Sequence, residues 1–220
     1  MSKIVSIHSF RGGTGKSNTA ANLAVLLAAQ GRRVGVVDTD IQSPGIHVLF
    51  GLDETKIKHS INDYLWGECS IQETVHDVSA NLGAEVSGKV YLIPSSINGA
   101  EIARVLRDGY EVSLLNDGFY DLIDEIDLDI LMIDTHPGIN EETLVSISIS
   151  DVLVLILRPD QQDYQGTAVT VDIARQLMVS NLMLLVNKVP KVFDLKDVKN
   201  KVERTYSAEV VGVLPHADEM

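Results

Sequence analysis

Short apolar runs alternate with longer segments of helical periodicity along most of the chain. Seven of these runs are rich in β-branched residues and have the nearly unbroken apolar character of strands that are covered on both faces. We predict strands at residues 4–8, 34–38, 90–93, 130–134, 152–157, 183–187 and 210–214. The alternation predicts an α/β fold, a doubly wound and mostly parallel sheet with helices on both faces.

Six segments have the helical pattern, at residues 16–30, 61–66, 100–108, 113–125, 166–179 and 195–205. The first of them consists largely of Ala and Leu, and Gly31 follows it as a left-handed cap. Between Asp53 and Gly88 the pattern gives no clear element boundaries. Because no linker, low-complexity segment or internal repeat interrupts the chain, we expect one domain over residues 1–220.

Composition narrows the possible partners and compartment. The chain has 18 basic and 31 acidic side chains, a net charge of -13, so binding of nucleic acid or anionic lipid would need a local basic patch. The one cysteine, Cys69, excludes an internal disulfide and a cysteine metal cluster. There is no signal-peptide pattern and no apolar run of the roughly 20 residues that cross a bilayer. We therefore expect a soluble cytoplasmic protein.

A glycine-rich turn, F-R-G-G-T-G-K-S, joins the first predicted strand to the first predicted helix. The backbone N–H groups of such a turn converge on an anion, and the helix N-terminus adds positive potential, so we expect a phosphate-binding P-loop. Lys16 would contact the β- and γ-phosphates, and Ser17 would bind Mg²⁺. The alternative is a turn that only reverses the chain. The loop residues expected at the nucleotide are Arg11, Gly12, Gly13, Thr14, Gly15, Lys16, Ser17 and Asn18.

This loop departs from the general P-loop pattern because Phe10 occupies the position of its first glycine. It resembles the deviant loop K-G-G-x-x-K-[ST] of the ParA/MinD family of dimerising ATPases, with Arg11 in place of the first lysine. The resemblance implies ATP and Mg²⁺ as ligands and an ATP-dependent homodimer in which that cation reaches the partner's phosphates. Three roles stay open for Arg11: a contact in trans, a local ion pair, or an exposed loop cation.

Two further predicted strands end in carboxylates. Asp38 and Asp40 follow the second strand, and Asp134 ends the strand at 130–134. The carboxyl ends of strands in a doubly wound sheet face the ligand crevice, so we expect all three carboxylates near the P-loop. The motif D-T-D resembles the D-x-D motif of the family. The resemblance implies that Asp40 activates the attacking water, that Asp38 supports Mg²⁺ through water, and that Asp134 is the Walker B acid. The alternative for Asp38 and Asp40 is capping of the following turn.

The resemblance continues to residue 215. Pro137 and Gly138 match the switch-like loop of the family, whereas His136 matches no role and is expected to be structural or solvent-facing. Asn187 and Pro215 stand at strand ends that in relatives surround the adenine, by hydrogen bonding and by packing respectively.

The family resemblance implies a slow, partner-stimulated ATPase. Such proteins position or partition an intracellular cargo, such as a plasmid, a chromosome locus or a carboxysome, on a surface that is often nucleoid DNA. Some members, including the carboxysome-positioning McdA branch, also lack the first lysine. The alternative is a nucleotide-binding interaction protein that places a septum, flagellum or pilus with little hydrolysis. A metal-delivery ATPase is disfavoured because there is no Cys-x-x-Cys pair.

Two segments of the sequence indicate whether the protein would bind DNA or a membrane. The segment Lys188–Arg204 holds six basic and three acidic side chains and could contact DNA phosphates, although a solvated helix face explains it equally well. We expect no MinD-like membrane helix in this chain, because only a few residues follow the last predicted strand. An adaptor protein is the other expected partner.

Overall fold

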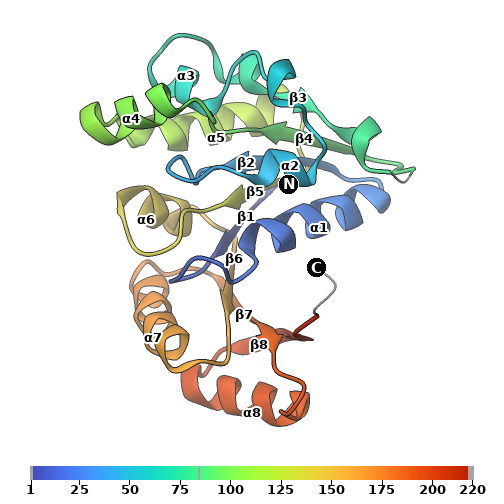
Figure 1. The fold of residues 1–220 in the computed structure, drawn as a ribbon, viewed down its shortest axis with the longest axis vertical. Helices are drawn as coiled ribbons and strands as arrows, with labels where there is room; N and C mark the ends of the chain where they lie inside the picture. Colours follow the sequence, from blue (N-terminus) through green and yellow to red (C-terminus); the bar gives the residue numbers. More distant parts are fainter. Residues whose placement is uncertain (1, 84, 218–220) are drawn as a thin grey trace.

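The computed structural model describes residues 2–83 and 85–217, which form one twisted sheet flanked by helices (Figure 1). The strands lie in the order β3-β4-β2-β5-β1-β6-β7-β8. Neighbouring strands are parallel, except that β3 and β4 pair antiparallel at one edge. The predicted doubly wound, mostly parallel α/β fold is confirmed.

All seven predicted strands are present. The strands are β1 (Lys3–His8), β2 (Arg33–Asp38), β3 (His76–Asp77), β4 (Lys89–Ile93), β5 (Ile130–Asp134), β6 (Val152–Leu157), β7 (Asn181–Val189) and β8 (Glu209–Pro215). The sequence pattern missed only β3, because a two-residue strand is too short to show a period.

The helices are α1 (Lys16–Ala29), α2 (Ile46–Leu49), α3 (Ile61–Leu65), α4 (Gly99–Asp108), α5 (Ser113–Glu125), α6 (Glu141–Ser148), α7 (Gln161–Gln176) and α8 (Leu195–Tyr206), with short 3₁₀ turns at Glu54–Lys56, Ile71–Thr74 and Ser79–Asn81. The pattern missed α2 and α6 and began α7 at Gly166. Helix α7 begins earlier because the Asp160 carboxylate caps it by accepting the N–H of Asp163 at 3.0 Å. The polar residues after Asp160 hide this start from any apolar period.

Helices cover both faces of the sheet, with α1 on the opposite side from α6 and α7 (Figure 1). Adjacent residues of β5 illustrate this arrangement. Met132 packs in the cluster that contains Ala20 and Ala24 of α1. Ile133 instead packs with Phe119 of α5. Successive side chains of a strand point to opposite faces, so each central strand contributes to two cores.

The first helix ends as its sequence predicts. Gly31 adopts a φ of 88°, its N–H donates to the carbonyl of Ala28, and the N–H of Arg32 donates to that of Leu27. These two bonds form a Schellman motif and satisfy carbonyls that the helix end leaves without partners. No helix in residues 2–83 and 85–217 is both long and apolar enough to span a bilayer.

Strand register brings the predicted carboxylates together. Strand β2 pairs with β5 so that Asp38 lies opposite Asp134. Strand β1 pairs with the other side of β5, and its carboxyl end leads directly into the loop before α1. The carboxyl ends of β2 and β5 therefore lie next to each other, on the side of the sheet where this loop begins.

Candidate nucleotide site

The loop between β1 and α1 has the backbone conformation of an anion-binding turn. Gly13 and Gly15 have φ values of 75° and 98°, a region that glycine enters without steric cost. The N–H of Thr19 donates to the carbonyl of Gly15 at 2.9 Å. The N–H groups of Lys16, Ser17 and Asn18 precede this first intrahelical donor and remain available for a ligand.

Lys16 is a buried cation at the start of α1, with 7% of its surface exposed. Burial lowers the pKa of its ammonium group, while the carboxylates of Asp134, Asp40 and Asp38 oppose this change. Three carboxylates thus act on one buried lysine. A divalent cation bound here would compensate carboxylate charge that Lys16 alone does not balance.

Asp134 and Thr14 each leave a buried oxygen without a partner. Asp134 Oδ1 and Thr14 Oγ1 make no hydrogen bond within the described residues. Burial raises the pKa of Asp134 to about 6, and the Ser17 hydroxyl and the Lys16 ammonium oppose that rise. An unmet buried acceptor costs about 1–3 kcal/mol, so these atoms suit a site that a ligand completes.

The oxygen donors at this site fit Mg²⁺. Ser17 and Asp134 offer a hydroxyl and a carboxylate side by side. Within residues 2–83 and 85–217, no three His, Cys, Asp or Glu side chains form a metal-binding group. A Mg²⁺ ion here would therefore take its remaining ligands from phosphate oxygens and water, as it does in nucleotide sites.

Asp38 is fully buried and shapes the turn after β2. Its carboxylate accepts the N–H of Asp40 at 2.9 Å and that of Gly45 at 3.3 Å. Burial raises the pKa of Asp38 to about 8, and the neighbouring Asp134 adds to the rise. These bonds realise the capping role that the sequence left as an alternative, while support of Mg²⁺ by Asp38 stays a prediction.

Asp40 is held by two side chains. The Nδ1 atom of His136 lies 2.7 Å from Asp40 Oδ1, and the Ser43 hydroxyl donates to the same oxygen at 2.9 Å. The prediction that His136 is structural or solvent-facing overlooked this contact with the expected catalytic carboxylate. No sequence pattern marks this pair, because Asp40 and His136 come together only through the register of β2 with β5, each two residues beyond the paired Asp38 and Asp134.

The loop after β5 is tied to the P-loop. His8 at the end of β1 is fully buried, and its Nδ1 lies 2.6 Å from the hydroxyl oxygen of Thr135. Burial lowers the pKa of His8 to about 3, with contributions from Lys16 and His136. The N–H of Gly138 donates to the Ser9 carbonyl at 3.1 Å. A change at the phosphate site could therefore reach the loop that resembles the family's switch.

Arg11 makes local ion pairs in this structure. Its guanidinium lies 3.4 Å from Asp160 and 3.5 Å from Asp163. Asp163 is buried and also binds the backbone N–H and the side chain of Arg158. The local reading of Arg11 therefore describes the single chain, while a contact in trans stays a prediction.

Asn187 braces the P-loop from β7. Its side-chain N–H donates to the Thr14 carbonyl at 2.8 Å, and the next residue, Lys188, donates from Nζ to the Gly13 carbonyl at 2.9 Å. Pro215 lies opposite Val189 at the end of β8. The structure thus places Asn187 at the loop and Pro215 at the end of the neighbouring strand, and their contact with adenine stays a prediction.

The basic segment Lys188–Arg204 is partly engaged within the chain. Lys199 pairs with Glu203 at 3.7 Å, and the Nζ atom of Lys201 lies 5.3 Å from the centre of the Tyr164 ring. Lys188 faces the P-loop, as described above. The segment is therefore not a continuous row of unengaged cations, and DNA binding stays a prediction.

Comparison with known proteins shows to which family the chain belongs. A family model described as "AAA domain" matches residues 2–189. The chain belongs to this family of ParA/MinD-like P-loop ATPases. The ATPase is 30% identical over 215 residues to an ATP-binding protein of Methanocaldococcus jannaschii, covering 98% of this chain and 75% of that relative.

The ATPase is also similar to two proteins whose names state a cellular role. It is 34% identical over 158 residues to the flagellum site-determining protein YlxH of Helicobacter pylori, covering 72% of this chain but only 49% of that relative. The septum site-determining protein MinD from Pyrococcus horikoshii, solved with Mg-ADP, shares the fold at a TM-score of 0.78 and 19% identity, covering 99% of this chain and 82% of that one. The narrower McdA assignment is not supported by these comparisons.

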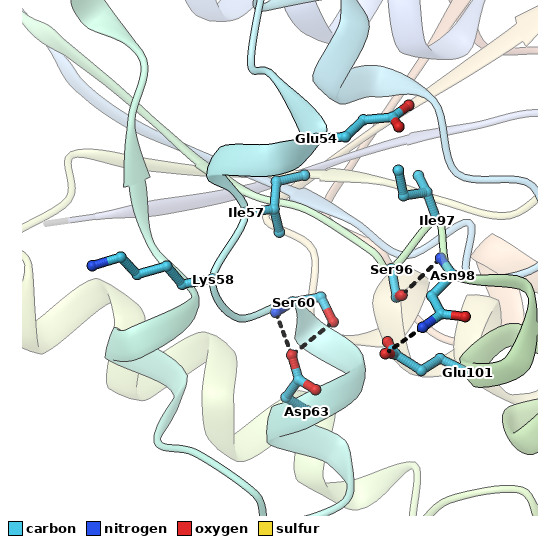
Figure 2. Close-up of a pocket in the computed structure, with 9 residues that line it drawn as sticks. All are labelled: Glu54, Ile57, Lys58, Ser60, Asp63, Ser96, Ile97, Asn98 and Glu101. Atoms are coloured by element: carbon cyan, nitrogen blue, oxygen red, sulfur yellow. Dashed lines mark hydrogen bonds between the residues drawn. The ribbon is translucent and has the colours of Figure 1, made fainter.

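A separate cavity of about 220 Å³ lies where β4 ends. Figure 2 shows that several of its polar residues bond to one another, whereas Glu54 and Lys58 are drawn without a hydrogen bond to the other lining residues. Ser60 donates to Asp63 from both its N–H and its hydroxyl, and the Asn98 amide donates to Glu101 at 3.1 Å. These bonds explain the cavity as a packing feature of two helix starts in the ATPase.

Proposed function

We propose that this ATPase binds Mg²⁺-ATP at the P-loop, forms a homodimer with it, hydrolyses it slowly and uses the cycle to position a cargo. The observation that carries the proposal is the burial of Lys16 at the start of α1, within the electrostatic influence of the carboxylates of Asp134, Asp40 and Asp38. A structural lysine would not need three carboxylates and an open set of backbone donors.

Each residue of the site has a distinct task. Lys16 and the backbone of residues 12–17 hold the phosphates, and Asn18 lies just beyond them on α1. Ser17 and Asp134 hold the metal and its water shell, with Asp38 fixing the turn beside them. The bound metal supplies charge compensation for the transferred phosphoryl group.

Asp40 orients the attacking water and accepts its proton. Its side chain is 17% exposed, and the hydrogen bonds that it accepts from His136 and Ser43 all go to Oδ1. A carboxylate with one oxygen anchored and one unoccupied can direct a water toward the phosphate site.

Arg11 links the site to dimerisation. In the single chain it is paired with Asp160 and Asp163 at distances at the long end of ion pairing. Exchange of these partners for the partner's phosphates would give the planar guanidinium a stronger, bidentate contact. Asn187 and Pro215 would line the adenine at the far side of the loop.

The cargo function rests on the relatives. One relative is named for flagellum site determination and a structural neighbour for septum site determination. We extend positioning to this chain, with an adaptor protein that stimulates hydrolysis and a cytoplasmic surface such as nucleoid DNA, contacted through Lys188–Arg204.

The local ion pairs of Arg11 favour a second candidate, a nucleotide-binding interaction protein with little hydrolysis. In this case Arg11 would stay with Asp160 and Asp163 in the nucleotide-bound chain, and no partner would complete the phosphate site.

The test compares the wild type, Arg11→Ala and Asp40→Ala in two measurements. The first is the solution mass with and without Mg²⁺-ATP, and the second is the rate of ATP hydrolysis. We expect an ATP-dependent dimer that Arg11→Ala loses, and Asp40→Ala should bind ATP and dimerise but not hydrolyse it. A monomer under all conditions that still binds ATP would favour the second candidate. Unchanged turnover in Asp40→Ala would remove Asp40 from its role.

A further inference from the structure

The imidazole of His136 anchors the carboxylate of Asp40 from a neighbouring strand end. The distance between His136 Nδ1 and Asp40 Oδ1 is 2.7 Å, the length of a charge-assisted hydrogen bond. An ionised carboxylate only accepts, so Nδ1 carries the proton in this contact. Both side chains are mostly shielded from water, with 22% and 17% of their surfaces exposed.

The anchoring leaves one carboxylate oxygen for chemistry. Oδ1 receives His136 and also the hydroxyl and the N–H of Ser43, at 2.9 and 3.2 Å. All three of these contacts are at Oδ1, and none of them involves Oδ2. Two donors from the Asp40 turn and one from the β5 loop thus fix the plane of the carboxyl group and the direction in which Oδ2 points.

The placement of the pair follows from the sheet. Asp38 of β2 is paired with Asp134 of β5, and Asp40 and His136 each follow two residues after this pair. His136 belongs to the loop that is hydrogen-bonded to the P-loop through Gly138 and Ser9. The position of Asp40 is therefore coupled to the same loop that would respond to nucleotide.

We propose that His136 is a positioning residue for hydrolysis, which holds Asp40 so that Oδ2 faces the attacking water. This inference rests on the proposed role of Asp40. Ser43 alone is a weaker anchor because it comes from the same turn and moves with Asp40, whereas His136 ties the carboxylate to a different strand. Without His136, the carboxylate keeps its charge but loses its fixed direction.

The test compares steady-state ATP hydrolysis of His136→Ala, His136→Asn and Asp40→Ala, with His76→Asn as the control. His76 lies on the edge strand β3 and bonds only a backbone carbonyl. We expect His136→Ala to lower kcat about 10–100-fold with KM changed less than about twofold, because misdirection of a catalytic group affects the chemical step. The amide of His136→Asn can replace the Nδ1 donor and should restore most of kcat. His76→Asn should match the wild type.

Two measurements separate positioning from loss of structure. In the Asp40→Ala background, adding His136→Ala should cause no further loss of kcat, since the two residues act as a unit. In the nucleotide-free protein, the imidazole ¹⁵N resonances of His136 should show a protonated Nδ1 and should shift in Asp40→Asn.

The outcomes distinguish this inference from the proposed function. If Asp40→Ala is inactive but folded His136→Ala hydrolyses ATP like the wild type, the inference is overturned and the role of Asp40 stands. If Asp40→Ala is fully active, the proposed catalytic role fails, and the inference fails with it. If His136→Ala does not fold, the kcat of His136→Asn and the resonance shift provide the test. His136 resonances that do not shift in Asp40→Asn would overturn the inference.

Discussion

Replacement of Lys16 by Ala should remove nucleotide binding while the fold survives. Lys16 begins α1, is buried, and is acted on electrostatically by the carboxylates of Asp134, Asp40 and Asp38. The change removes the one buried cation in this group and leaves the three carboxylates facing the phosphates. Alanine suits the first turn of a helix, so α1 itself should persist.

The expected loss of affinity follows from the contact that disappears. A charge-assisted hydrogen bond to phosphate contributes about 1.5–3 kcal/mol. At about 1.4 kcal/mol for each factor of ten, this raises the Kd for ATP roughly 10- to 150-fold. The uncompensated carboxylates add repulsion to the bound phosphates, so this range is a lower bound.

The assay is a calorimetric or fluorescence titration with ATP and Mg²⁺, supported by thermal unfolding to confirm that the variant is folded. Lys188→Ala is the matched control, because Lys188 is also a lysine at the loop, but it is exposed and its Nζ donates to the Gly13 carbonyl. We expect the control to change Kd less than about fivefold, since an exposed bond contributes little. A folded Lys16→Ala that binds ATP like the wild type would refute the P-loop assignment.

Three other predictions follow from the backbone, a buried histidine and the basic segment. Gly15→Ala and Gly31→Ala both place alanine at a positive φ, and each should lose about 1–2 kcal/mol of unfolding free energy. Only the Cβ at position 15 would meet Asn187, at 2.6 Å, so only Gly15→Ala should also lose ATP affinity. Equal ATP affinity of the two variants would contradict the argument. The pKa of His8 is lowered to about 3, so in the unfolded chain the histidine binds a proton that the folded chain does not, and its contribution to stability is present above pH 6.5 and lost as pH falls toward 3. Chemical unfolding at several pH values should show the stability of the wild type falling relative to His8→Gln by up to about 1.4 kcal/mol per pH unit in that window, and a pH-independent difference would exclude this linkage. Neutralising the three lysines on one helix should weaken retention on DNA and flatten its dependence on salt, whereas a wild-type dimer that does not bind DNA would leave this segment as plain surface; the lysines are Lys196, Lys199 and Lys201.

Local chemistry made much of the site predictable. The loop from Arg11 to Ser17 combines glycines that reach positive φ with a helix start, and both properties depend on residues adjacent in sequence. The strand ends at Asp38 and Asp134 were visible because an apolar run closing on a carboxylate is also a local pattern. The helix at Glu141–Ser148 escaped this approach because its polar, serine-rich sequence shows no apolar stripe.

The mostly parallel α/β sheet and the P-loop follow from the amino-acid sequence, because hydrophobic period and glycine conformation act over a few neighbouring residues. Which distant side chains meet depends instead on how the strands and helices pack in three dimensions. The pairing of β2 with β5 joins Asp40 to His136, and the packing of α7 joins Arg11 to Asp160 and Asp163. These contacts depend on strand order and register, which are set by the packing of the whole sheet, and no short segment contains that information.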